Sequence, residues 1–182
     1  MMLCTCAAIV VTAGAASGRP RVSALPVLRS NGIGSLHFGA PRQAVLAALQ
    51  PSLGRPNAGG VNTGCGKDLT EVAWHDLIAE FRNGRLSGYR FILGGWPLTT
   101  PGSPRDHVSS TAPTPRLRTQ AGITLGATLG QLHSAYPALE RTGAVRWTAR
   151  DGLTFTEPST VTRPTSPANE IIEIQTGTCG DF

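Results

Sequence analysis

Two stretches of the chain repeat the same pattern, and this self-similarity constrains the fold more than any other feature. Phe38-Gly39-Ala40-Pro41 stands directly before an amphipathic segment over 42–49. Leu125-Gly126-Ala127-Thr128 stands directly before a similar segment over 129–136. Internal repeats indicate that one supersecondary unit occurs more than once in a fold. We therefore expect two copies of one unit.

Each copy predicts a short helix that begins just after its glycine. Thr128 is a good N-cap residue, and Pro51 and Pro137 are expected to end the two helices. The apolar positions recur at helical spacing and give each helix one buried stripe. They are Val45 and Leu49 in the first copy, and Leu132 and Tyr136 in the second.

Three antiparallel strands are predicted after each helix. They span 71–75, 77–81 and 85–93 in the first copy, and 144–148, 153–156 and 170–175 in the second. Asn83-Gly84 is a strong signal for a hairpin turn, and Asp151-Gly152 is a second one. The predicted fold class is therefore α+β, with two tandem repeats of one helix and a three-stranded antiparallel sheet.

Composition shifts divide the chain into five predicted parts. Residues 97–121 are rich in Pro, Ser and Thr and have no apolar period, so they predict a linker. Residues 157–169 predict a loop within the last hairpin. The parts are a signal peptide (1–16), a flexible N-terminal segment (17–30), repeat 1 (31–96), the linker (97–121) and repeat 2 (122–182).

Residues 1–16 have the features of a secretory signal peptide. Leu3–Val11 is apolar, the segment has no charged side chain, and Ala13-Gly14-Ala15 fits a small-x-small cleavage site. The lack of Lys or Arg makes the n-region atypical, and a disordered apolar tail is the alternative. Lipidation of Cys6 would need further sequence upstream. We expect secretion or a location in the cell envelope.

Two cysteines remain after removal of such a signal, Cys65 and Cys179. Cysteines in exported proteins usually pair, so we predict a disulfide between them. A bridge across so long a loop contributes about 4–5 kcal/mol in the chain-entropy model. The alternative is two free buried thiols. The chain has no CxxC or HxxxH spacing, so no metal or cofactor is expected.

The charge of the chain does not point to a nucleic-acid partner. The 182 residues carry a formal net charge of +5, and Lys67 is the single lysine among 16 cationic residues. Nucleic-acid-binding proteins cluster their cations on one face or in one run, whereas the arginines here are scattered from Arg19 to Arg163. No apolar run reaches the ~18 residues of a membrane span. We expect a monomer with no transmembrane segment in the mature chain.

The chain lacks the common sequence motifs of catalysis. There is no GxSxG, HExxH, P-loop or GxGxxG pattern. His75 and Asp76 are neighbours, and neighbours on a strand project to opposite faces. Four carboxylates fall on predicted strands, where solvated strand charges are the common interpretation. They are Glu71, Glu80, Glu170 and Glu173. The sequence predicts a protein that is not an enzyme.

The repeated pattern resembles that of secreted bacterial tandem-repeat modules. These are related to the beta-lactamase inhibitory proteins and to the SmpA/OmlA-like envelope lipoproteins. Phe38-Gly39-Ala40-Pro41 and Leu125-Gly126-Ala127-Thr128 carry the resemblance, together with Val45, Leu49, Leu132 and Tyr136 and with Trp74, Phe81, Trp147 and Phe155. It implies two repeats whose joint sheet face grips a target enzyme.

The function predicted from these observations is non-catalytic binding of a protein or cell-envelope partner. The alternatives are a secreted enzyme inhibitor of the beta-lactamase inhibitory type and a small secreted hydrolase, which would need a cleft with converging polar groups. Core packing is the alternative for the two tryptophans of the candidate surface. That surface consists of Trp74, His75, Tyr89, Arg146 and Trp147.

Overall fold

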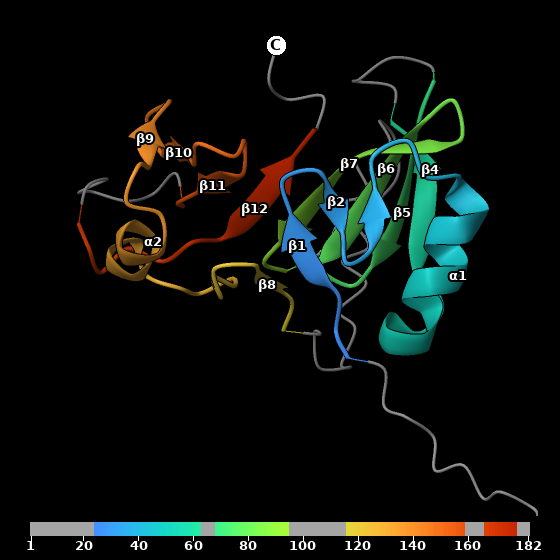
Figure 1. Ribbon diagram of the computed structural model, residues 1–182, viewed down its shortest axis with the longest axis horizontal. Coiled ribbons are helices and arrows are strands. Elements are labelled where there is room, and N and C mark those ends of the chain that lie inside the picture. The colour runs from blue at the N-terminus through green and yellow to red at the C-terminus, as the bar shows by residue number, and fades with distance from the viewer. Residues whose placement is uncertain (1–23, 63–67, 95–115, 159–165, 178–182) are drawn as a thin grey trace, which may run out of the picture.

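The computed structural model describes residues 24–62, 68–94, 116–158 and 166–177, and it contains two sheets and two short helices (Figure 1). The first half holds β1 (Val27–Arg29), β2 (Gly32–Ile33), β3 (Leu36–His37), α1 (Arg42–Leu53), β4 (Ala58–Val61), β5 (Leu69–Trp74), β6 (Leu77–Arg82) and β7 (Arg85–Ile92). The second half holds β8 (Arg118–Thr119), α2 (Leu129–Ala135), β9 (Glu140–Arg141), β10 (Arg146–Thr148), β11 (Thr154–Thr156) and β12 (Glu173–Thr176).

The fold is rich in β-structure, so the prediction of an α+β fold made of helix-plus-three-strand repeats was wrong. A sheet of four strands lies beside a sheet of eight, whereas α2 has only 7 residues. The short strands β1, β2, β3, β8 and β9 have only two or three residues each. Strands of two or three residues are too short to show an alternating pattern in the sequence.

The eight-stranded sheet joins the two halves of the chain in one layer. Its order is β4-β5-β6-β7-β12-β11-β10-β9, so β7 and β12 form its centre. Gln175 lies opposite Arg90 in this central pair, and Ile174 lies opposite Phe91. Both edges of the sheet, β4 and β9, therefore come from the segments that follow the two helices (Figure 1).

Hydrogen bonds around the two glycines of the repeated pattern correspond in the two halves. Gly39 N–H donates to Leu86 O, and Leu86 N–H donates to Ala40 O. In the second half the Gly126 amide donates to the Ile171 carbonyl, and the Ile171 amide donates to the Ala127 carbonyl. Each glycine therefore fixes the chain against the large sheet just before a helix begins. These corresponding hydrogen bonds agree with the internal repeat, which stays a prediction.

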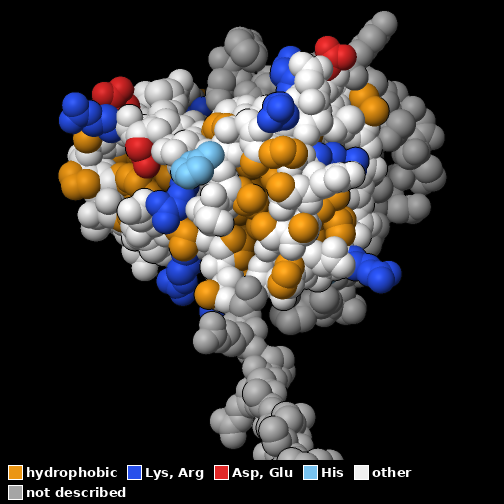
Figure 2. Space-filling view, turned by 45° about the vertical axis from the view of Figure 1, so that its right-hand side comes forward, with side chains coloured by type: hydrophobic (Ala, Val, Ile, Leu, Met, Phe, Trp, Pro, Cys, Tyr) orange, Lys and Arg blue, Asp and Glu red, His pale blue; other side chains and the backbone are white. Residues whose placement is uncertain are grey.

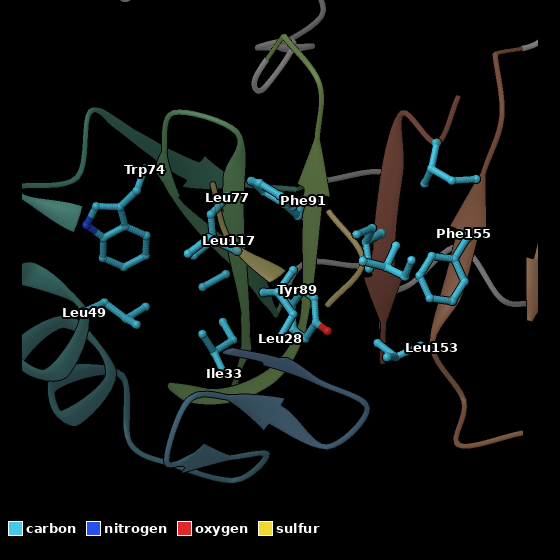
Figure 3. Packing of buried hydrophobic residues seen from close by; sticks show 14 of the residues in the cluster. Leu28, Ile33, Leu49, Trp74, Leu77, Tyr89, Phe91, Leu117, Leu153 and Phe155 are labelled. Atoms are coloured by element: carbon cyan, nitrogen blue, oxygen red, sulfur yellow. The ribbon is translucent and has the colours of Figure 1, made fainter. Parts of the chain in front are cut away.

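The core lies between the large sheet and a second layer formed by α1 and the small sheet. Figure 3 shows Trp74, Leu77, Tyr89 and Phe91 pointing from the large sheet toward Leu49 of α1 and toward Leu28 and Ile33 of the small sheet. Burial of each such side chain contributes about 1.5–3 kcal/mol. The four residues of the large sheet share one face, because side chains alternate between the two faces along each strand.

The predicted start of α2 is confirmed, whereas the predicted end of α1 is wrong. Thr128 caps α2 as predicted, since its hydroxyl accepts from Gln131 N and the Gln131 side chain accepts from Thr128 N. Pro51 does not end α1, which continues to Leu53. A proline in the last turn costs a single helical hydrogen bond, and burial of Leu53 supports the extra turn.

Two glycines allow β7 and β12 to approach closely at the centre of the sheet. A Cβ on Gly177 would lie 2.4 Å from Ser87 O, and a Cβ on Gly88 would lie 2.5 Å from Gly177 O. Gly177 also has a φ of 63°, a backbone conformation that residues other than glycine rarely adopt. The seam between the two halves therefore depends on the absence of side chains at these positions.

Candidate functional site

One face of the eight-stranded sheet packs in the core, and the opposite face carries a charged cluster. Glu71 of β5 and Glu80 of β6 lie directly opposite each other, and Arg90 of β7 shares their face. Arg90 Nη2 donates to Glu71 Oε1 at 2.7 Å, and Arg90 Nε donates to Glu80 Oε1 at 2.9 Å. One guanidinium thus bridges two like charges that would otherwise repel each other across the hairpin.

The cluster is largely buried. Glu71 is 1% exposed and Glu80 is 2% exposed, whereas the Arg90 side chain is 21% exposed. Asn62, directly after β4, donates from Nδ2 to Glu71 Oε1 at 2.7 Å. The second oxygen of Glu80, Oε2, is buried and has no hydrogen-bond partner. Two carboxylates therefore share one cation, and one carboxylate oxygen stays unsatisfied.

Burial raises the pKa of Glu80 from 4.5 to about 7, although the Arg90 guanidinium lowers it. The neighbouring carboxylates of Glu71 and Glu173 raise it further. A carboxyl group whose pKa is higher in the folded state binds a proton more tightly there than in the unfolded chain. The free energy of unfolding should therefore fall as the pH rises from about 4.5 to about 7, and then level off.

The Glu80→Gln substitution tests this charge. We expect the variant to match the wild type near pH 4.5 and to be about 1–3 kcal/mol more stable at pH 8, because each pKa unit corresponds to about 1.4 kcal/mol. Urea unfolding followed by tryptophan fluorescence at several pH values measures the difference. Glu140→Gln, on the exposed edge strand β9, is the control and should leave the pH profile unchanged. A Glu80→Gln profile as steep as that of the wild type would contradict the assignment.

The sheet face that carries the charged cluster also carries three threonines from the second half of the chain. The Thr142 hydroxyl lies 2.9 Å from the Thr148 hydroxyl, which lies 3.4 Å from that of Thr154. Thr154 in turn lies opposite Gln175, which lies opposite Arg90. We call this line of side chains the polar row. Its members are Asn62, Glu71, Glu80, Arg90, Gln175, Thr154, Thr148 and Thr142.

The two ends of the polar row differ in exposure. Glu71 and Glu80 are buried at one end, whereas Thr148 is half-buried and Thr142 is exposed at the other. Threonine is β-branched, so its side chain has few rotamers to lose when a partner binds. The threonine end therefore presents hydroxyl groups in mutual contact at the surface of the sheet.

Three of the five residues of the candidate surface are in the core. Trp74 and Tyr89 are fully buried, and Trp147 is 7% exposed. Trp74 donates from Nε1 to Gly54 O at 3.0 Å, and the Tyr89 hydroxyl donates to Arg29 O at 3.0 Å. These three residues point inward from their strands. The prediction that they lie on a solvent-exposed face was therefore wrong.

His75 and Arg146 remain partly exposed, and they lie in different places. His75 occupies the turn between β5 and β6 with a φ of 53°, and its backbone amide donates to Asn57 Oδ1. Arg146 lies two residues before Thr148 in β10, so both project on the face of the polar row. Among the five predicted residues, Arg146 alone therefore shares a face with the polar row.

Trp147 is held by a buried carboxylate. Its Nε1 donates to Glu157 Oε1 at 2.5 Å, and Asn169 Nδ2 donates to Glu157 Oε2 at 2.5 Å. The imidazole ring of His133 packs edge-on against the indole ring, with 5.1 Å between the two ring centroids. Glu157 and Asn169 stand at the two ends of the segment predicted as a loop. The carboxylate thus joins the two ends of that segment.

Two hollows open on the described surface. The larger, about 820 Å³, is an open groove beside α2 and the chain over 121–128. The smaller, about 290 Å³, lies between α1 and β1–β3 and is lined mainly by apolar residues such as Leu25 and Leu36. Figure 2 shows hydrophobic side chains gathered near the middle of the face that it presents. Within the described residues, no group of three or more metal-binding side chains occurs.

No family model, curated protein or solved structure matches the chain. No helix within the described residues is long and apolar enough to cross a membrane. Cys65, Cys179 and the proposed signal over 1–16 lie outside the described residues.

The role of Arg90 was not predicted from the sequence, and the prediction that Glu71 and Glu80 are solvated strand charges was wrong. Glu80 and Arg90 each stand between two apolar residues of a predicted strand, which is an unusual place for a charge. A β-bulge between β6 and β7, where the register shifts between Glu80 and Phe81, hid the relation between Glu80 and Arg90. Counting pairs back from the Asn83-Gly84 turn therefore misplaces Glu80 by one residue.

Proposed function

We propose that the chain is an exported, non-catalytic binding module that recognises a protein or cell-envelope partner through the threonine end of the polar row. The observation that carries the proposal is the alignment of polar side chains on one sheet face. Arg90 lies opposite Gln175 and Gln175 opposite Thr154, and hydroxyl contacts then join Thr154 to Thr148 and Thr148 to Thr142. The apolar, uncharged segment before Ala13-Gly14-Ala15 supports export.

The buried end of the polar row supports the contact end without touching a partner. Arg90 ties β5, β6 and β7 together through Glu71 and Glu80. Because Gln175 lies opposite Arg90, the position of β12 follows that of β7. A surface that is ordered before binding loses less conformational entropy on association, which favours recognition by a sheet face.

A hydrolase would require a different arrangement of the histidines. A histidine that acts in general acid-base catalysis must lie within hydrogen-bond reach of its partner groups. His133 is exposed and packs against Trp147, and the Nδ1 atom of His75 is buried without a hydrogen-bond partner. Within the described part of the chain, neither histidine forms an ion pair with a carboxylate. The side chains of the polar row therefore suit recognition better than hydrolysis.

The test is affinity capture from the medium and envelope of the producing cells with three forms of the chain. The wild type should retain a partner that Thr148→Lys loses at least tenfold, because the new ammonium group disrupts the hydroxyl line. Ser35→Lys adds the same charge at an exposed turn of the small sheet and should retain the partner. Equal capture by all three forms, or hydrolysis of an ester or peptide substrate by the wild type, would overturn the proposal.

A further inference from the structure

The edge strand β4 differs from the other sheet edges in the described residues. It has four residues, Ala58-Gly59-Gly60-Val61, with no charge and no proline. The opposite edge, β9, consists of Glu140 and Arg141, and the edges of the small sheet have two residues each. Natural edge strands are usually protected from pairing by charge, proline or short length. The β4 edge has neither a charged residue nor a proline.

The β4 edge is also open to solvent. Gly59, Gly60 and Val61 are exposed, and Val61 retains 57% of its accessible surface. Figure 1 shows β4 at the end of the eight-stranded sheet beside α1. An extended segment can therefore reach the strand along its length.

The register of β4 determines which peptide groups face outward. The Asn62 amide donates to Leu69 O at 2.9 Å, and Gly60 lies opposite Glu71. Inward and outward peptide groups alternate along an antiparallel strand. The peptide groups of Gly60 and Asn62 therefore point to β5, and those of Gly59 and Val61 point away from the sheet.

We propose that β4 pairs antiparallel with β4 of a second copy of this chain, about a two-fold axis at Gly60. In this register Gly59 lies opposite Val61 of the second copy, and Val61 lies opposite its Gly59. Each pair exchanges two hydrogen bonds, so all four outward peptide groups of each strand find partners. Such a reciprocal arrangement is the isologous contact of a symmetric dimer.

The side chains of β4 suit a second copy of the same strand. At the two-fold axis two glycines face each other at the closely spaced type of pair, where the Cα atoms approach to about 4.5 Å. The side chain of each Val61 lies over Gly59 of the other copy, which has no side chain to clash. Since no residue of β4 is charged, the pairing opposes no like charges within the strand.

The dimer brings two polar rows together on one face of a continuous sheet. Residues opposite each other in an antiparallel pair project on the same face. Asn62, which donates to Glu71, is two residues from Gly60 and shares its face. The proposal rests on the β4 edge alone and holds whether or not the threonine end binds a partner.

Four residues per copy make a small interface, so the dimer should dissociate on dilution. Stable complexes bury about 1,200–2,000 Å². Sedimentation equilibrium of the purified full chain should show an effective mass that rises toward twice the monomer mass with concentration. Val61→Pro removes the outward N–H without removing a bond to β5, so this variant should stay monomeric. Val61→Thr keeps the N–H and the β-branched shape and should still dimerise.

Hydrogen exchange gives a second readout that does not depend on a folded variant. In the wild type the amides of Gly59 and Val61 should exchange at least threefold more slowly at high than at low protein concentration. The amide of Gly84, in the turn between β6 and β7, should show no such dependence. A constant monomer mass at all concentrations, dimerisation of Val61→Pro equal to that of the wild type, or unchanged exchange at Gly59 and Val61 would overturn the proposal.

Discussion

The Arg90→Ala substitution is expected to reduce the free energy of unfolding by about 3–5 kcal/mol at pH 8, since it leaves two buried carboxylates without their cation. Glu71 and Glu80 would then face each other across the β5–β6 hairpin, one 1% and the other 2% exposed. The loss should be smaller at pH 5, where Glu80 already carries a proton in the folded state. Urea unfolding at both pH values measures the two losses.

Two further variants separate the charge of Arg90 from the packing of its side chain. Arg90→Lys keeps the charge, but a single ammonium nitrogen cannot reproduce the two separate donors Nε and Nη2. We expect a loss between those of the wild type and Arg90→Ala. Adding Glu80→Gln to Arg90→Ala should restore part of the stability, because one buried charge is removed. If the double variant is no more stable than Arg90→Ala at pH 8, the loss comes from packing and not from unpaired charge.

The Gly177→Ala substitution is expected to cost about 2–5 kcal/mol, the sum of backbone strain and of a forced displacement at the central seam. The new Cβ would lie 2.4 Å from Ser87 O and 3.0 Å from the Phe38 ring. Because these atoms belong to β7 and to the segment before α1, neither can move without disturbing the joint between the two halves of the chain. Thermal unfolding by circular dichroism gives the loss.

A matched glycine isolates the contact from the strain. Gly84 has a φ of 70°, close to the 63° of Gly177, but a Cβ there would meet no atom within 4 Å. Gly84→Ala should therefore cost only about 1–2 kcal/mol, the strain of the left-handed backbone. Equal losses for the two variants would show that the close approach of β7 and β12 contributes nothing beyond the backbone conformation.

Local patterns in the sequence determined the longer elements. Helical spacing located α1 and α2, although α1 extends past Pro51, and Thr128 was correctly predicted as the N-cap of α2. The alternation of apolar side chains and the Asn83-Gly84 turn located β6 and β7. These signals depend on residues close together in the chain, which is why they are legible without a structure.

The faces of the sheet were harder to assign. Tyr89 and the two tryptophans were candidates for a binding surface, yet all three are core residues. Aromatic side chains suit both an interface and a core. Their place depends on which face of the sheet the second layer covers, and the short strands of that layer give no sequence signal.

By itself the sequence determined the two helices, the main hairpins and the glycine turns, because these depend on contacts between near neighbours. Only the tertiary structure decided that the two halves join in one sheet through β7 and β12, and that Arg90 bridges Glu71 and Glu80. It also revealed that β4 ends the sheet as an uncharged, exposed edge. Long-range pairing is set by which strands meet in space, and a bulge of one residue is enough to move a charge from one partner to another.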